Sequence, residues 1–96
     1  MRTKNAARIT PAESAHLAKV KRCACVLCDA PPPTEAHHII QGLHFTTVAL
    51  CDFCHRGANG ALNADMLRLR FGTADLRAQV RALNETQRRV AALEDA

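Results

Sequence analysis

Apolar residues at helical spacing predict a first helix close to the N-terminus. Leu17 and Val20 form the apolar side of this helix, which we expect over residues 11–21. The segment 10–13 reads Thr-Pro-Ala-Glu and gives a strong start signal. Thr is a good N-cap, Pro suits the first helical position, and Glu at the third position completes a capping box.

Two more helices are predicted after residue 60. Leu62, Met66 and Leu69 follow one another at helical spacing over residues 61–70, and Gly72 should end that helix. Thr73 is then expected to cap a longer helix over residues 74–93. A heptad seam runs along this helix, formed by Leu76, Val80, Leu83, Gln87 and Val90. We expect the seam to pack on the rest of the chain, and a homodimeric coiled coil is the alternative that it leaves open.

The segment between these helices has no helical period. Three prolines at 31–33 favour an extended path. Residues 35–40 and 46–50 predict two short strands that pair across a turn at Gly42. A short helix should begin near Phe53 and end early, at the glycines that follow. The pattern therefore predicts one α+β domain over residues 1–96, with a basic arm and helix (1–22), a central core (23–63) and C-terminal helices (64–96).

Composition suggests that this core needs support. The chain has 96 residues, three of them aromatic, and ten are Cys or His (five of each). A chain of this size has a thin core, to which large rings normally contribute much. It has neither a membrane-length apolar run nor a secretory signal, so we expect a soluble cytoplasmic protein with reduced thiols.

Charge is uneven along the chain. Residues 1–22 hold six basic residues and one acid, while residues 23–60 hold one Arg and three acids, within a total of +4. A basic arm beside a Cys- and His-rich centre suits a polyanion such as DNA. A solvated basic helix is the simpler alternative. If DNA binds, we expect phosphate contacts from Lys19, Lys21, Arg22 and Arg56.

The most informative motif is a pair of cysteine knuckles, Cys25-x2-Cys28 and Cys51-x2-Cys54. Two such knuckles supply the four thiolates of a closed, tetrahedral zinc site. Zinc binding would also support the thin core, because it supplies folding free energy on the order of 10 kcal/mol in small modules. Cys23, the odd thiol, is expected to be a small buried hydrophobe. A zinc ribbon that binds DNA or protein without chemistry has the same cysteine pattern.

Histidines separate a ribbon from an enzyme. His37 and His38 lie between the knuckles, and His55 directly follows Cys54. A ribbon needs none of them, whereas His is both a common metal ligand and a base near neutral pH. Of the other two, His16 is expected to be structural, and the sequence assigns no role to His44.

Together these motifs resemble the His-Asn-His (HNH) endonucleases, most closely small phage nucleases related to the Ref recombination-enhancement protein. The resemblance covers residues 10–63 and rests on both knuckles, the segment 36–39 and His55. It implies a zinc-stabilised ββα-metal core flanked by an N-terminal helix and a long C-terminal helix. It also implies a DNA endonuclease that uses Mg²⁺ or Mn²⁺, with a recombinase filament as a partner suggested by the resemblance alone.

The resemblance implies a role for each histidine of the motif. His38 would be the general base that activates water, and His37 would bind the catalytic ion. His55 would complete that metal site, with Asn59 as a further ligand candidate. Because neighbouring residues on a strand point to opposite faces, a bulge or a strand end at Ile39 should be needed to bring His37 and His38 to one site.

The chain departs from the family pattern at three places, one of which is a short hairpin loop from Gly42 to Phe45. The central Asn that orients the base in the family is missing, and Thr46 and Thr47 occupy that stretch. Leu62 stands where the phage relatives carry a histidine. A catalytically degenerate, zinc-stabilised module that binds DNA or protein is therefore the alternative function. An assembly protein that dimerises through residues 74–93 is a third possibility.

Overall fold

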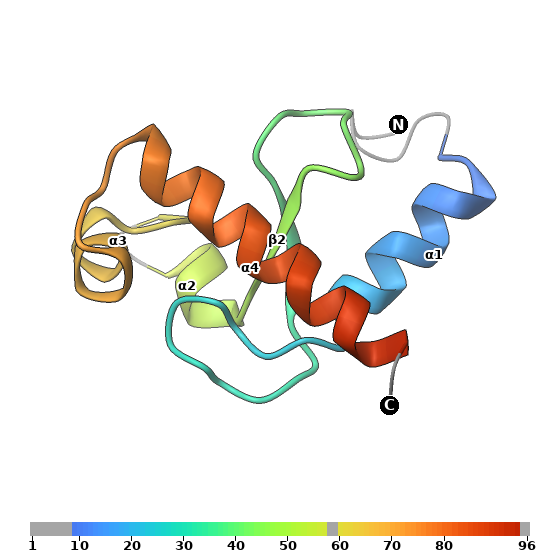
Figure 1. The fold of residues 1–96 in the computed structure, drawn as a ribbon, viewed down its shortest axis with the longest axis horizontal. Helices are drawn as coiled ribbons and strands as arrows, with labels where there is room; N and C mark the ends of the chain where they lie inside the picture. Colours follow the sequence, from blue (N-terminus) through green and yellow to red (C-terminus); the bar gives the residue numbers. More distant parts are fainter. Residues whose placement is uncertain (1–8, 58–59, 95–96) are drawn as a thin grey trace.

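In the computed structural model, which describes residues 9–57 and 60–94, the chain forms a small α+β fold with a two-stranded antiparallel sheet. The elements follow the order α1 (Pro11–Val20), β1 (Glu35–His38), β2 (Thr47–Leu50), α2 (Asp52–Arg56), α3 (Ala64–Phe71) and α4 (Leu76–Glu94). Figure 1 shows α4 running across β2, with α1 on one side of the sheet and α2 and α3 on the other.

The start of α1 confirms the predicted capping box. The Thr10 side chain accepts a hydrogen bond from the Glu13 N–H (3.1 Å), and the Thr10 N–H donates to Glu13 Oε1 (2.9 Å). The end of α1 is closed by the segment that leads into β1. There the Thr34 hydroxyl donates to the carbonyl oxygens of Val20 (3.2 Å) and Cys23 (2.8 Å). Carbonyl groups left over at the helix end are thus satisfied inside the fold.

The sheet has the predicted antiparallel pairing, with shorter strands. Its register places Glu35 opposite Leu50 and His38 opposite Thr47. The turn at Gly42 is confirmed, since Gly42 has a positive φ of 86° and the Leu43 N–H donates to the Ile40 carbonyl (3.1 Å). All four residues of β2 are fully buried.

The outer edge of β2 is covered rather than open. The Val26 N–H, from the first knuckle, donates to the Ala49 carbonyl (3.0 Å). The Ala49 N–H donates to Thr86 Oγ1 of α4 (3.2 Å). The Thr86 hydroxyl in turn donates to the Ala82 carbonyl (3.0 Å). A knuckle strand and a helical hydroxyl together satisfy the backbone groups of a sheet edge that would otherwise be unpaired.

The ends of the remaining helices differ in part from the prediction. Gly57 ends α2 as expected, because its N–H donates to the Phe53 carbonyl (2.8 Å) and a Cβ there would lie 2.3 Å from that oxygen. Helix α3 begins later than predicted, since the Asn63 side chain accepts from the N–H groups of Asp65 and Met66. In α4 the cap is Asp75, not Thr73, because its carboxylate accepts from the Arg77 N–H (2.9 Å).

Apolar faces of the two C-terminal helices also differ from the prediction. In α3 the buried residue is Leu67, while Leu69 is 82% exposed. In α4 the buried residues follow every fourth position, at Ala78, Ala82, Thr86 and Val90. Small residues on this face let the helix approach the strand and the knuckle closely. Of the predicted seam, Val90 is buried and Leu83 packs against the core. The first seam residues, Leu76 and Val80, lie exposed, and dimerisation through this helix stays a prediction.

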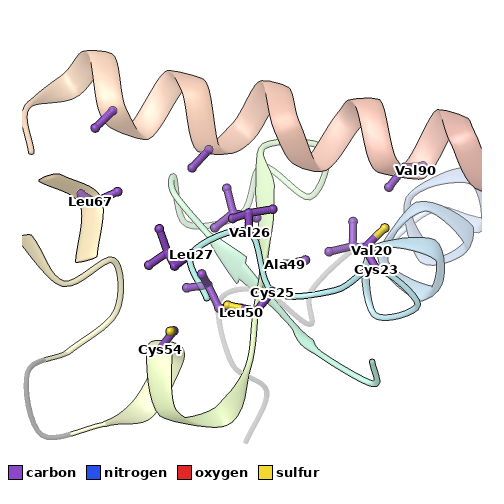
Figure 2. Packing of buried hydrophobic residues seen from close by; sticks show 13 residues of the cluster. Val20, Cys23, Cys25, Val26, Leu27, Ala49, Leu50, Cys54, Leu67 and Val90 are labelled. Carbon is purple, nitrogen blue, oxygen red and sulfur yellow. The ribbon is translucent and has the colours of Figure 1, made fainter. Parts of the chain in front are cut away.

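The buried core holds no aromatic ring among the described residues, and only Phe71 packs against its edge. Figure 2 shows α4 above the first knuckle and β2, with Val90 near Val20 and Cys23. Phe45 and Phe53 are exposed, at 48% and 69%. Three cysteines are among the buried apolar residues instead, namely Cys23, Cys25 and Cys54. None of the described helices combines the length and apolar composition needed to cross a membrane.

Candidate metal centre and histidine pairs

The four cysteines of the two knuckles meet at one point of the fold. Their sulfur atoms all lie within 4.8 Å of one another, and they belong to Cys25, Cys28, Cys51 and Cys54. The sulfurs of Cys28 and Cys51 lie 3.6 Å apart. Four sulfurs at about 2.3 Å from a tetrahedral zinc ion would be about 3.8 Å apart. The group is therefore close enough to hold a metal ion, in agreement with the prediction.

Local backbone geometry brings each pair of sulfurs together. In the first knuckle the Cys25 N–H donates to the Ala30 carbonyl (3.0 Å) and the Asp29 N–H donates to the Cys25 carbonyl (2.9 Å). Asp29 has a positive φ of 61°, which closes this tight turn. In the second knuckle Cys51 is the N-cap of α2, and its sulfur accepts from the Cys54 N–H (3.5 Å). Each knuckle thus forms from contacts within a few residues.

Helix α4 supports the first knuckle from a distance in sequence. The Arg89 guanidinium donates to the carbonyl oxygens of Ala24 (3.1 Å) and Cys25 (3.3 Å), and to the Asp29 carboxylate (3.0 Å). Its side chain is only 17% exposed, and it also pairs with Glu85. Arg89 holds the knuckle through its backbone, next to the place where thiolate charge would gather.

The pKa values of Cys25, Cys28 and Cys54 are shifted in different directions. Burial raises the pKa of Cys54, and hydrogen bonds with neighbouring thiols add to this rise. Burial also raises the pKa of Cys28. For Cys25 burial acts in the same direction, but backbone N–H groups pointing at its sulfur bring the pKa below its ordinary value. Four thiolates this close need a cation to compensate their charge, which a divalent ion would supply.

Cys23 stays outside this group, as predicted. It is 4% exposed, and its thiol donates to the Lys19 carbonyl (3.5 Å) at the end of α1. Burial raises its pKa, so the thiol stays protonated. It acts as a small apolar residue of the core.

His37 and His55 form the first of two histidine pairs. Their ring centroids lie 5.2 Å apart, with an angle of 66° between the ring planes. His37 comes from β1 and His55 from α2, directly after the last cysteine. Burial is the main cause that lowers the pKa of His37, and the charge of His55 adds to it. Imidazole nitrogen atoms are common ligands for divalent cations.

Glu35 completes this pair, and sequence reasoning did not single it out. The His55 Nδ1 donates to Glu35 Oε1 at 2.5 Å, and the Arg56 Nε donates to the same oxygen at 2.9 Å. The hydrogen bond from His55 is the main cause that lowers the pKa of Glu35. A signal was available, because Glu35 lies two positions before His37 and two residues apart on a strand share a face. The contact occupies Nδ1 of His55 and leaves Nε2 for a ligand.

His38 and His44 form the second pair, at the last position of β1 and in the loop that follows it. Nε2 of His38 and Nδ1 of His44 lie 3.0 Å apart. The sheet has no bulge that would turn His38 toward His37, and the strand ends directly after His38. Burial is the main cause that lowers the pKa of His38, followed by the charges of His44 and His55. His16 lies nearby on α1, where its ring packs against Phe45 at 5.2 Å between centroids.

The remaining predicted site residues are less closely grouped. Asn59 lies outside the described residues. Lys21 and Arg22 are exposed directly after α1. Arg56, on α2, is 68% exposed and pairs with Glu35. Lys19 lies half-buried in the last turn of α1. A joint role of these four cations in DNA binding stays a prediction.

Comparisons with protein-family models, with curated proteins and with solved structures find no match for this chain.

Proposed function

We propose that this chain is a metal-dependent DNA endonuclease of the His-Asn-His type, with a structural zinc ion at its four cysteines. The carrying observation is the pair formed by His37 and His55, whose ring centroids lie 5.2 Å apart beside the four-cysteine group. The succession β1, β2, α2 that presents this pair supports the proposed ββα-metal core.

A divalent ion such as Mg²⁺ or Mn²⁺, when bound, would act as a Lewis acid on the scissile phosphate. In the proposal His37 and His55 hold that ion, and Glu35 holds the His55 ring by accepting from its Nδ1. This leaves the other nitrogen of His55 for the ion. Asn59 remains a further ligand candidate.

His38 is the proposed general base. It occupies the last position of β1, next to His37 in sequence, and burial keeps its pKa below the ordinary value. A neutral imidazole can take a proton from water at neutral pH. In the proposal, the free nitrogen of His38 takes a proton from the water that attacks phosphorus.

A plasmid assay tests the endonuclease. Purified zinc-loaded protein should nick supercoiled DNA in Mg²⁺ or Mn²⁺, and chelation of the added ion should stop the reaction. We expect His38→Ala to lower the rate by roughly 10²- to 10⁴-fold, the usual contribution of a general base. Zinc content and unfolding temperature serve as controls for folding. No nicking with either ion, or nicking unaffected by His38→Ala, would contradict the proposal.

The second candidate is a zinc-stabilised module that binds nucleic acid without cutting it. Lys21 and Arg22, exposed next to each other after α1, favour this candidate, as does the missing central Asn. DNA binding that persists in a His37→Ala, His38→Ala, His55→Ala variant, without cleavage by the native protein, would select it. Phosphate contacts should also make this binding fall steeply with salt.

A further inference from the structure

His44 is the buried partner of the proposed base. Its side chain belongs to the loop between β1 and β2 and is only 2% exposed. The rings of His38 and His44 meet edge to face, with centroids 5.2 Å apart and an angle of 84°. The 3.0 Å distance between His38 Nε2 and His44 Nδ1 is that of a hydrogen bond.

The loop that carries His44 is well supported. On one side, the Leu43 N–H donates to the Ile40 carbonyl (3.1 Å). On the other side, the Thr46 N–H and hydroxyl both donate to the Leu43 carbonyl, at 3.2 Å and 2.9 Å. The Thr47 hydroxyl reaches the carbonyl of His44 itself (3.4 Å). Because both flanks are hydrogen-bonded and the ring is buried, His44 has little freedom to turn away from His38.

This contact restricts which nitrogen of His38 can react. A neutral histidine carries one N–H and one bare nitrogen. Nε2 of His38 is occupied by His44, so only Nδ1 is left to meet a water molecule. To accept a proton there, His38 must carry its own proton on Nε2 and donate it to a bare nitrogen. Nδ1 of His44 lies where that acceptor is needed.

We propose that His44 is a positioning residue that accepts a hydrogen bond from His38 Nε2 and so keeps His38 Nδ1 bare. The catalytic part of this inference rests on the proposed endonuclease function, whereas the tautomer does not. In the reaction, a water O–H bond breaks and its proton goes to His38 Nδ1. The water oxygen bonds to phosphorus, and the bond from phosphorus to the leaving sugar oxygen breaks. That oxygen keeps the electron pair of the broken bond and takes a proton from a solvent water molecule. The His38 Nε2–H keeps its hydrogen bond to His44 Nδ1 throughout, and this hydrogen bond stabilises the imidazolium that forms on His38.

Two substitutions of His44 test whether it acts by accepting a hydrogen bond or only by filling space. In His44→Asn the side-chain oxygen can occupy the position of Nδ1 and accept the same hydrogen bond. In His44→Leu the side chain fills a similar volume but cannot accept. Zinc content and unfolding temperature should show that both variants fold before they are compared.

The first measurement is the tautomer of His38, from nitrogen-15 spectra of histidine-labelled, zinc-loaded protein at a pH where its imidazoles are neutral. We expect the proton on Nε2 in the native chain and in His44→Asn, and a mixture of tautomers in His44→Leu. A proton on Nδ1 in the native chain would overturn the inference. An unchanged His38 tautomer in folded His44→Leu would also overturn the inference. If only His44→Asn folds, a shift of the His38 proton to Nδ1 in that variant would overturn it.

The second measurement is plasmid nicking by the same proteins. We expect His44→Leu to lower kcat by roughly 10- to 100-fold with little change in KM, part of the contribution of the base itself. His44→Asn should recover most of this loss. Equal rates in both variants would overturn the positioning role. If the native protein has the expected tautomer but does not nick the plasmid, the proposed function is contradicted. The catalytic part of the inference then fails as well, whereas the tautomer assignment stands.

Discussion

The four-cysteine group and the two histidine pairs lie around the same small sheet but are built in different ways. Each cysteine pair is brought together within one turn, by hydrogen bonds between residues at most five positions apart. The histidines come from β1, the loop after it and α2, so the register of the strands decides which rings meet. A site made of local turns can be read from spacing, whereas a site made across a sheet depends on the face that each side chain takes.

The largest effect should come from breaking the cysteine group. Cys25→Ser removes one thiolate, so we expect loss of bound zinc and of the folded state. The reason is that metal binding supplies on the order of 10 kcal/mol, comparable with the total stability of a small domain. Metal analysis and far-ultraviolet circular dichroism measure both losses. Cys23→Ala is the matched control, since this buried thiol lies outside the group and its loss should leave zinc content unchanged. Full folding of metal-free Cys25→Ser would contradict a structural role for the ion.

Arg89 tests how far the cysteine group depends on α4. We expect Arg89→Met to lower stability by about 2 kcal/mol, because the Ala24 carbonyl loses the Arg89 donor and the Cys25 carbonyl keeps only the Asp29 N–H. Asp29 and Glu85 also lose a largely buried partner. For a chain of this size the unfolding temperature should fall by roughly 10 °C. Arg88→Met is the control, because Arg88 pairs with the same Glu85 but is 68% exposed. The exposed pair should contribute at most about 0.5 kcal/mol. Equal effects of the two substitutions would show that the knuckle does not need α4.

Glu35 tests the histidine side of the comparison. We expect Glu35→Gln to weaken binding of the catalytic ion by roughly 10-fold or more, because an orienting carboxylate raises the ligand strength of its histidine. Titration of zinc-loaded protein with Mn²⁺, followed by calorimetry, gives this affinity. Zinc content should not change, which would separate the two regions. Asp65→Asn, at a carboxylate 90% exposed on α3, is the control. Unchanged Mn²⁺ affinity in Glu35→Gln would remove Glu35 from the site.

The smallest effect concerns pH and His16. Burial lowers the pKa of His16, with a smaller contribution from the charge of Lys19, and its Nε2 is buried without a hydrogen-bond partner. In the unfolded chain the His16 side chain has the ordinary histidine pKa of about 6.5, so it binds a proton more readily than in the folded chain. Stability from this group is present above that pH and is lost as pH falls toward the lower, folded pKa. We expect His16→Phe, which keeps a ring against Phe45, to lose less stability between pH 7.5 and 5.5 than the native chain. Denaturant unfolding at each pH measures this, and parallel curves for the two proteins would contradict it.

The cap of α1 and each of the two knuckles could be predicted because they depend on residues close together in sequence. The capping box at Thr10 and Glu13 is one example, and the turn at Gly42 is another. The buried face of α4 could not, because Leu76 and Val80 make a better apolar seam than the small residues that the structure buries. The close approach of α4 to β2, through Thr86, favours small side chains over large ones.

By itself the sequence determined the start of α1, the two knuckles and the set of histidines available for chemistry. Only the tertiary structure decided that His38 meets His44, that His55 meets Glu35 and that Arg89 reaches the first knuckle. The physical reason is separation along the chain. Contacts within a turn follow from a few backbone angles, whereas contacts between distant segments depend on strand register and helix placement, which the whole core sets together.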